Sequence, residues 1–101
     1  MEKLDTIDHI AIQVNDIKKS VEFYTNRFKC KVLYQDESWG FLEFENTKLA
    51  FVKKEQHPFH FAILKENLEN NDEVVKHRDG SISKYVKDID GNNIELLKYN
   101  E

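Results

Sequence analysis

Short runs of alternating hydrophobic and polar residues recur along the chain, and a period of two is typical of half-buried β-strands. In the run from Asp8 to Val14, His9 lies on the face opposite to the isoleucines and the valine. The run from Phe59 to Ile63 repeats this pattern, with His60 on the face opposite to the large apolar residues. The two runs lie about half a chain length apart, which indicates a weak internal repeat.

Between the two runs, the pattern predicts one helix and three strands. Asp16 is a suitable N-cap and apolar residues then return at helical spacing, so we expect an amphipathic helix from Asp16 to about Lys29. We expect strands over residues 31–37, 39–45 and 48–53. The first half therefore has the order strand, helix, strand, strand, strand.

The second half is expected to repeat this order without a comparable helix. Residues 65–72 follow its first strand, and this segment is polar, rich in asparagine and too short for more than a helical turn. A two-residue hairpin turn is expected at Asp79 and Gly80. The strands of this half are expected over residues 59–64, 73–78, 81–87 and 93–99.

This order predicts an α+β fold, in which two βαβββ-type modules form a cupped mixed sheet. The 101 residues are expected to form a single domain, with module one at about residues 1–54 and module two at about 55–101. Because its helix is largely missing, module two leaves apolar strand residues partly unprotected, and we expect a homodimer to cover them. These residues are Phe59, Phe61, Ile63, Ile94 and Leu96.

The last expected strand adds a carboxylate to the two histidines. Glu95 lies on the face opposite to Ile94 and Leu96. A single histidine in a strand is more often structural than a ligand, so the interpretation depends on His9, His60 and Glu95 sharing one strand phase. Two imidazoles and one carboxylate predict a metal site with open coordination positions, and this donor set suits Mn, Fe, Zn, Ni or Co without choosing among them.

Other residues are candidates for contact with a bound molecule. We expect a cavity near the metal lined by Trp39, Phe41, Tyr85, Leu97 and Tyr99. Three of the candidates also have a simpler interpretation. Glu43 can be a solvated carboxylate, Tyr85 a packing residue and Lys76 a plain surface charge. His57 and His77 are expected to be exposed, with His57 as an alternative ligand in place of His60. The candidates are Glu43 and Tyr85 as catalytic residues, and Trp39, Phe41, Lys76 and Tyr99 as substrate-binding residues.

Composition and charge narrow the class of protein. Hydrophobic residues make up 40% and charged residues 34%, as in soluble globular proteins. The net charge is −4 and no basic stripe interleaves with aromatic residues, so we expect a small-molecule ligand and no nucleic acid. No apolar run approaches a membrane span, and with Cys30 as the single cysteine a cytoplasmic location is expected.

Three motifs resemble the vicinal oxygen chelate superfamily, which includes glyoxalases, bleomycin-resistance proteins and dioxygenases. Residues 8–16 look like the first strand and helix cap of this family, and residues 20–24 look like its S-x-x-F-Y helix. Residues 88–96 look like its closing D-P-D-G-x-x-I-E-L signature, with Ile89 in place of the proline. The resemblance spans nearly the whole chain, and it places His9, His60 and Glu95 on the metal-ligand positions of the family.

The resemblance also implies a function. Glyoxalase I-type members take a fourth ligand from the fourth strand, where this chain has Ala50 and Val52, so a three-ligand site is implied. The expected protein is a metal-dependent enzyme for a small oxygen-rich molecule, with lyase, transferase and dioxygenase chemistry all open. The alternative is a metal-free protein that sequesters a small molecule, as bleomycin-resistance members do.

Within the superfamily, the pattern is most similar to the fosfomycin-resistance branch. Trp39 followed by residues 41–44 is similar to that branch, as is Tyr85, which lies ten residues before Glu95. Lys76 lies near the phosphonate-binding lysine of the branch. The basic carboxy-terminal residues of those enzymes have no counterpart here, so efficient fosfomycin conjugation is not expected.

Overall fold

The computed structural model describes residues 3–68, 74–77 and 80–99. These residues form one helix and eight strands, in the order that the hydrophobic pattern predicts. Residues 69–73, 78 and 79 lie outside the described ranges, and with them parts of the predicted segments 65–72 and 73–78 and of the turn at Asp79. The elements are β1 (Ile7–Val14), α1 (Ile17–Arg27), β2 (Lys31–Gln35), β3 (Trp39–Glu43), β4 (Lys48–Lys53), β5 (His60–Leu64), β6 (Val75–Lys76), β7 (Ile82–Lys87) and β8 (Asn93–Lys98).

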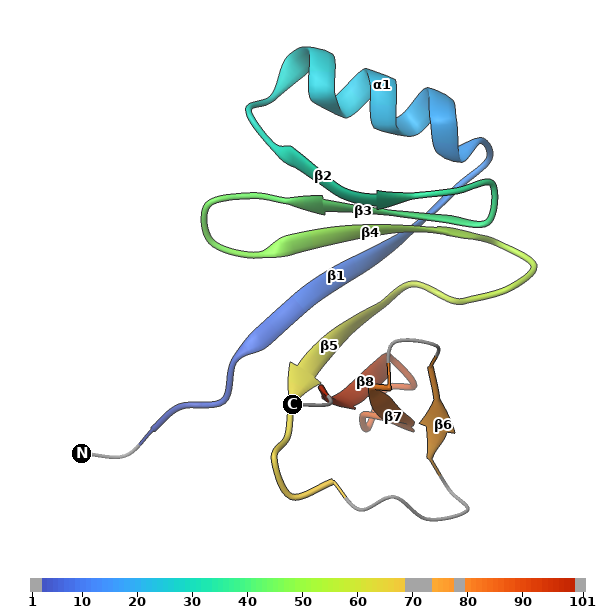
Figure 1. The fold of residues 1–101 in the computed structure, drawn as a ribbon. Coiled ribbons are helices and arrows are strands. Elements are labelled where there is room, and N and C mark those ends of the chain that lie inside the picture. The colour runs from blue at the N-terminus through green and yellow to red at the C-terminus, as the bar shows by residue number, and fades with distance from the viewer. Residues whose placement is uncertain (1–2, 69–73, 78–79, 100–101) are drawn as a thin grey trace.

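All eight strands belong to one mixed sheet, in the order β2-β3-β4-β1-β5-β8-β7-β6. Each half contains one parallel pair, β1 with β4 and β5 with β8, and the halves join through the antiparallel pair of β1 and β5. The predicted α+β fold of two strand-rich halves is therefore confirmed. The pairing brings β1, β5 and β8 side by side, which are the strands that carry the two histidines and Glu95 (Figure 1).

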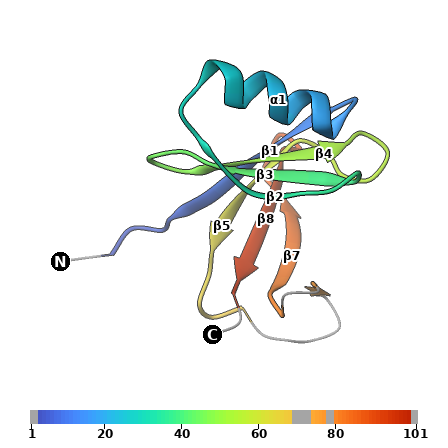
Figure 2. The ribbon, with the colours of Figure 1, turned by 45° about the horizontal axis from the view of Figure 1, so that its top comes forward.

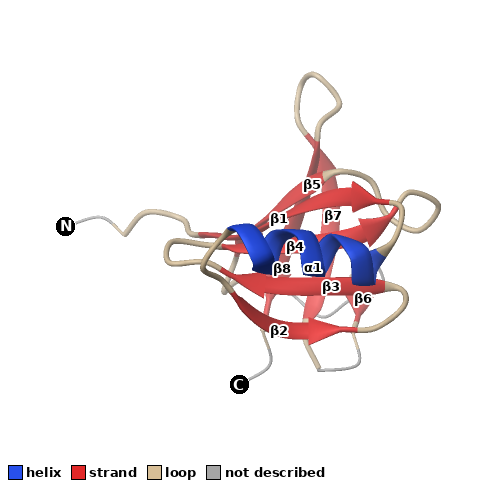
Figure 3. Cartoon of the chain, turned by 90° about the horizontal axis from the view of Figure 1, so that it is seen from above, coloured by secondary structure: helices blue, strands red, loops and turns tan. Residues whose placement is uncertain are grey.

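The helix α1 covers only the first half of the sheet (Figure 3). The Asp16 side chain accepts a hydrogen bond from the Lys19 backbone N–H at 3.0 Å, so the predicted N-cap is confirmed. Ile17 and Val21 are buried against Leu42 and Phe51, which are fully buried. This single helix of 11 residues is too short and too polar to cross a membrane.

The outer face of the second half has no helix over it in the described part of the chain (Figure 2). Phe61 pairs with Ile94 and with Ile10 in neighbouring strands, so these side chains share the outer face. Ile10 is 43% exposed, although it shares its strand face with Ile12 and Val14. The reason is its distance from α1, which covers only the later part of β1, where Ile12 and Val14 pack against the helix.

A β-bulge interrupts β1 at Asp8. Ile7 pairs with Ile63 and His9 pairs with Ala62, so two steps along β1 match one step along β5. Asp8 is therefore the extra residue of a bulge, which redirects side chains relative to strict alternation. As a result, both Asp8 and His9 are buried on the inner face, where simple alternation would place only His9.

The buried contact between α1 and the sheet predicts the effect of a core truncation. Phe51→Ala should lower the free energy of unfolding by about 3–5 kcal/mol, because the ring lies between α1 and the strands and leaves a cavity. As a control, Phe23→Ala on the half-exposed side of α1 should cost only about 1 kcal/mol. Urea denaturation of both variants tests this, and equal losses would contradict the assigned core.

Candidate metal centre

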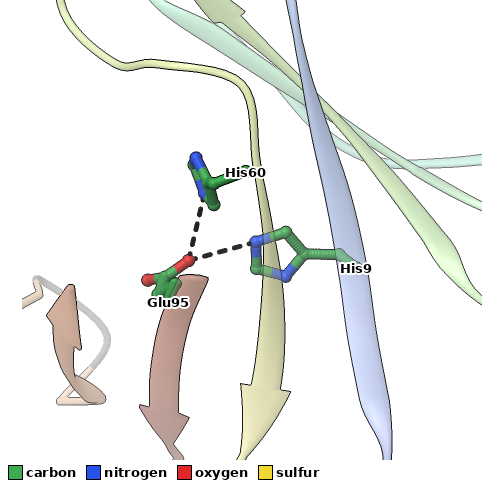
Figure 4. Close-up of side chains that lie close together, drawn as sticks. All are labelled: His9, His60 and Glu95. Carbon is green, nitrogen blue, oxygen red and sulfur yellow. Dashed lines mark ion pairs between the residues drawn. The ribbon is translucent and has the colours of Figure 1, made fainter. Parts of the chain in front are cut away.

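Three buried side chains from β1, β5 and β8 converge on one point (Figure 4). The Nε2 atoms of His9 and His60 each lie 3.3 Å from the same carboxylate oxygen, Oε1 of Glu95. Strand register explains the meeting, because Ala62 of β5 pairs with His9 on one side and with Glu95 on the other. The shared inner face predicted for His9, His60 and Glu95 is therefore observed.

The hydrogen bonds on the far side of each ring show that these three residues fit a metal ion. Nδ1 of His60 lies 2.9 Å from the Pro58 carbonyl, which can only accept, so this nitrogen carries a hydrogen. Nδ1 of His9 lies 2.8 Å from Oδ2 of Asp8. In the neutral form of each ring, Nε2 then has a free lone pair that faces the carboxylate. Three acceptor atoms, the two Nε2 atoms and Oε1 of Glu95, therefore lie together with no hydrogen between them. A cation satisfies such a set.

The spacing also fits. Two ligand atoms at roughly 2.0–2.2 Å from one ion lie about 3–3.5 Å apart at common coordination angles. The two nitrogen-to-oxygen distances of 3.3 Å fall in this range. The ligand atoms of His9, His60 and Glu95 are thus already spaced in this structure almost as they would be around a bound ion.

Electrostatics favour the charged forms of the ligands. Burial alone would raise the pKa of Glu95, but the close contacts of its carboxylate with the imidazoles of His60 and His9 outweigh it and hold this pKa well below its usual range. Burial alone would lower the pKa of His9, but hydrogen bonds to Asp8 and Glu95 outweigh it and raise this pKa. Both shifts therefore favour additional positive charge beside Glu95, which a metal ion would also supply.

A cavity of about 780 Å³ opens above the three ligands. The five residues expected in its walls all line it, together with Ala50 and Val52, which occupy the fourth-strand positions and cannot ligate. The His9 ring packs edge-on against Phe41, and the His60 ring packs in the same way against Tyr85. Most of the wall is aromatic or aliphatic, as in pockets that hold the apolar body of a small molecule. The five expected residues are Trp39, Phe41, Tyr85, Leu97 and Tyr99.

Two predicted site residues lie away from the cavity. Glu43 has the same strand phase as Trp39 and Phe41, but it is exposed at the end of β3 and does not line the cavity. Lys76 lies on the short strand β6 near the edge of the sheet and does not line it either. A shared face fixes the side of the sheet on which a residue lies but not its distance from the ligands.

Sequence patterns missed Asp8 and His77. Asp8 contacts His9 only because of the β-bulge, which the alternation of β1 conceals. His77 was expected to be exposed, but it is half-buried, lies 2.8 Å from the Ser83 hydroxyl and 3.8 Å from the second oxygen of Glu95. His77 directly follows β6, and its backbone N–H donates to the Ser81 carbonyl just before β7. The pairing of β6 with β7 therefore brings the His77 ring close to Ser83 and Glu95. His57 is exposed at the cavity wall and is not among the converging ligands.

Tyr85 has a clear protonation state. Burial and the nearby charge of Glu95 both raise the pKa of its phenol well above the ordinary value. At neutral pH the side chain is therefore a neutral hydrogen-bond donor at the cavity wall, and it is not a phenolate base. This state suits a residue that donates a hydrogen bond to a bound molecule.

Solved structures with the same fold cover nearly the whole chain. A hypothetical protein from Bacillus halodurans has a TM-score of 0.78 and 22% identity, with 98% of this chain and 97% of that chain covered. Methylmalonyl-CoA epimerase from Streptomyces coelicolor has a TM-score of 0.78 and 18% identity, with 98% and 100% covered. A glyoxalase/bleomycin resistance protein/dioxygenase superfamily member from Vibrio splendidus has a TM-score of 0.70 and 13% identity, with 96% of this chain and 100% of that chain covered. At these identities the likeness concerns the fold.

Sequence comparison adds the family. No curated protein matches the chain in sequence. A family model described as the Glyoxalase/Bleomycin resistance protein/Dioxygenase superfamily matches residues 6–83, which is most of the chain. The matched segment includes His9, His60 and the helix and all the strands of the first half. Together with the shared fold, this match shows that the chain belongs to the glyoxalase/bleomycin resistance protein/dioxygenase superfamily.

Proposed function

We propose that this protein is a metal-dependent enzyme of the vicinal oxygen chelate type, acting on a small molecule with two neighbouring oxygen atoms. The observation that carries the proposal is the convergence of three buried acceptor atoms, from His9, His60 and Glu95, at the base of a cavity. A divalent ion bound there would supply Lewis-acid chemistry to a substrate oxygen. We also propose that the protein is cytoplasmic.

The residues around the site suggest how a substrate would be held. Trp39 stacks on Tyr34 and leans on Phe41, which makes one continuous aromatic wall for an apolar or flat part of the molecule. Tyr85 on the opposite side would donate a hydrogen bond, since its phenol stays protonated. The described lining residues include no lysine or arginine, which favours a substrate of low negative charge over a phosphonate. The resemblance to the fosfomycin-resistance branch therefore gains no support from the cavity.

The residues that line the cavity also support a second candidate function. A largely aromatic cavity of about 780 Å³ can also hold a small molecule without metal, so a sequestering protein of the bleomycin-resistance type stays open as the alternative. The type of reaction also stays open for the enzyme. Epimerisation joins the lyase, transferase and dioxygenase options, because two solved structures with this fold are of methylmalonyl-CoA epimerases from different organisms.

We also propose that two copies associate through the outer face of the second half. Ile10 and Phe59 are about half exposed, and Phe61 and Ile94 continue the same apolar face. An uncovered apolar face of this kind is uncommon on a monomer. A second copy is the simplest partner that presents a surface of the same chemistry.

Metal binding tests the proposed function. Protein purified without a histidine tag should bind one Mn²⁺ per chain in calorimetry, and His60→Ala should abolish stoichiometric binding, because it removes one of three ligands. The matched control is His57→Ala, which removes an imidazole from the cavity wall and should leave binding intact. Equal binding by the parent protein and His60→Ala would overturn the assignment, and loss in His57→Ala alone would transfer the ligand role to His57.

The raised pKa of His9 predicts opposite pH trends with and without metal. In the metal-free protein, protonated His9 stabilises the fold fully below the unfolded-state pKa of about 6.5, and this stabilisation disappears as pH rises through the raised folded-state pKa. With excess Mn²⁺ the same loss of a proton frees a ligand, so the stabilisation by metal should increase with pH. Thermal unfolding from about pH 5.5 to 8.5, with chelator or with Mn²⁺, measures both trends. Parallel curves would contradict the role of His9.

Sedimentation tests the proposed association. The protein should be a dimer at micromolar concentration, and Phe61→Lys should shift it to a monomer, because it places a charge in the centre of the outer face. Phe23→Lys places the same charge on the exposed side of α1 and should leave the dimer intact. A monomeric parent protein, or equal behaviour of the two variants, would contradict this interface.

A further inference from the structure

We infer that Asp8 is a positioning residue for His9, which keeps the ligand atom Nε2 of this ring free of hydrogen, and that Lys48 and Tyr99 hold Asp8 in place. This inference rests on the proposed metal site. The carboxylate of Asp8 lies behind the His9 ring, on the side away from Glu95, so it would act through His9 and not on the ion itself.

The ring of His9 lies between two competing carboxylates. Nδ1 is 2.8 Å from Oδ2 of Asp8, and Nε2 is 3.3 Å from Oε1 of Glu95. A neutral imidazole has one ring hydrogen, and the stronger acceptor contact decides which nitrogen carries it. The shorter contact to Asp8 favours hydrogen on Nδ1. Without Asp8, the hydrogen would move to Nε2, bond to Glu95 and block the atom that must bind the ion.

The Asp8 carboxylate makes two further contacts besides the one to His9. Oδ2 also accepts a hydrogen bond from the Tyr99 hydroxyl at 2.7 Å, and Oδ1 lies 2.9 Å from Nζ of Lys48. Lys48 itself lies over the rings of Phe41 and Tyr99, at 5.3 and 5.4 Å from their centroids. Lys48 of β4 thus fixes one oxygen, and Tyr99, the residue after β8, fixes the other. The ammonium group of Lys48 at 2.9 Å favours the ionised form of this buried carboxylate.

The β-bulge explains why the sequence provides this carboxylate directly beside the ligand. In a regular strand, Asp8 and His9 would lie on opposite faces, and no contact between them across the ring would form. The register shift of β1 against β5 places both side chains on the inner face. His60 differs, since its Nδ1 is held by the neutral carbonyl of Pro58. The ionised partner should therefore make His9 the more strongly donating of the two imidazoles.

A simpler interpretation is that Asp8 and Lys48 form an ion pair that only stabilises the fold. The two interpretations differ in what Asp8→Ala and Asp8→Asn would change. A purely structural pair would alter the stability of the protein but neither the tautomer of His9 nor the metal affinity of the folded protein. A positioning role would change both.

Nitrogen-15 NMR and Mn²⁺ titration of the full chain separate these interpretations. In metal-free protein, at an alkaline pH where the nitrogen-15 shifts themselves show that His9 is neutral, the parent should show hydrogen on Nδ1 of His9, and Asp8→Ala should show the hydrogen on Nε2. Mn²⁺ affinity should fall roughly 10–100-fold in Asp8→Asn, which keeps the shape but removes the charge. Tyr99→Phe should cause a smaller loss in the same direction. Asp16→Asn is the matched control and should bind Mn²⁺ as the parent does, since asparagine is an equally good N-cap.

The outcomes are distinct. If folded Asp8→Ala and Asp8→Asn keep the parent tautomer and affinity, the positioning role is overturned and the metal site stands. If the parent binds no Mn²⁺, the proposed function fails, and the tautomer in metal-free protein alone decides the role of Asp8. If Asp8→Ala does not fold, Asp8→Asn and Tyr99→Phe decide it through the same two measurements.

Discussion

The meeting of two imidazole nitrogens at one buried carboxylate oxygen is the interaction on which the rest of the site depends. An isolated ionised carboxylate in this position would cost several kcal/mol in lost hydration. Glu95 is nevertheless buried, and its contacts with the imidazoles of His60 and His9 keep its pKa low. The site therefore requires a positive charge at its centre, either a proton on an imidazole or a metal ion. That requirement connects the metal proposal, the pH dependence and the role of Asp8.

The topology supplies this meeting through the order of the strands. β1 and β5 lie at the centre of the sheet and β8 lies next to β5, so three ligands from distant parts of the chain need only a shared face to come together. Small residues next to the ligands, such as Ala11 and Ala62, leave room above the sheet for a cavity. The outer face serves a different purpose in each half. α1 covers it in the first half, whereas no helix covers it in the described residues of the second half.

The sequence predicted those features that depend on local periodicity. The faces of His9, His60 and Glu95 follow from an alternation of two, and the start of α1 follows from its N-cap Asp16. It missed features that depend on three-dimensional packing. The bulge at Asp8 breaks the period without any glycine or proline to mark it, and the approach of His77 to Glu95 depends on the pairing of β6 with β7 at the edge of the sheet. Strand phase also could not show that Glu43 lies at the exposed end of β3 and away from the cavity, because the phase of a strand fixes the face and not the depth.

Anomalous diffraction from crystals of the untagged protein soaked in Mn²⁺ tests the central claim most directly. We predict one strong peak per chain, bounded by Nε2 of His9, Nε2 of His60 and Oε1 of Glu95, and at roughly 2.0–2.2 Å from each atom. The Asp8 carboxylate should stay on Nδ1 of His9, with no direct contact to the peak. A map with no peak between these three atoms, in crystals that show Mn²⁺ bound elsewhere, would contradict the assignment of this site.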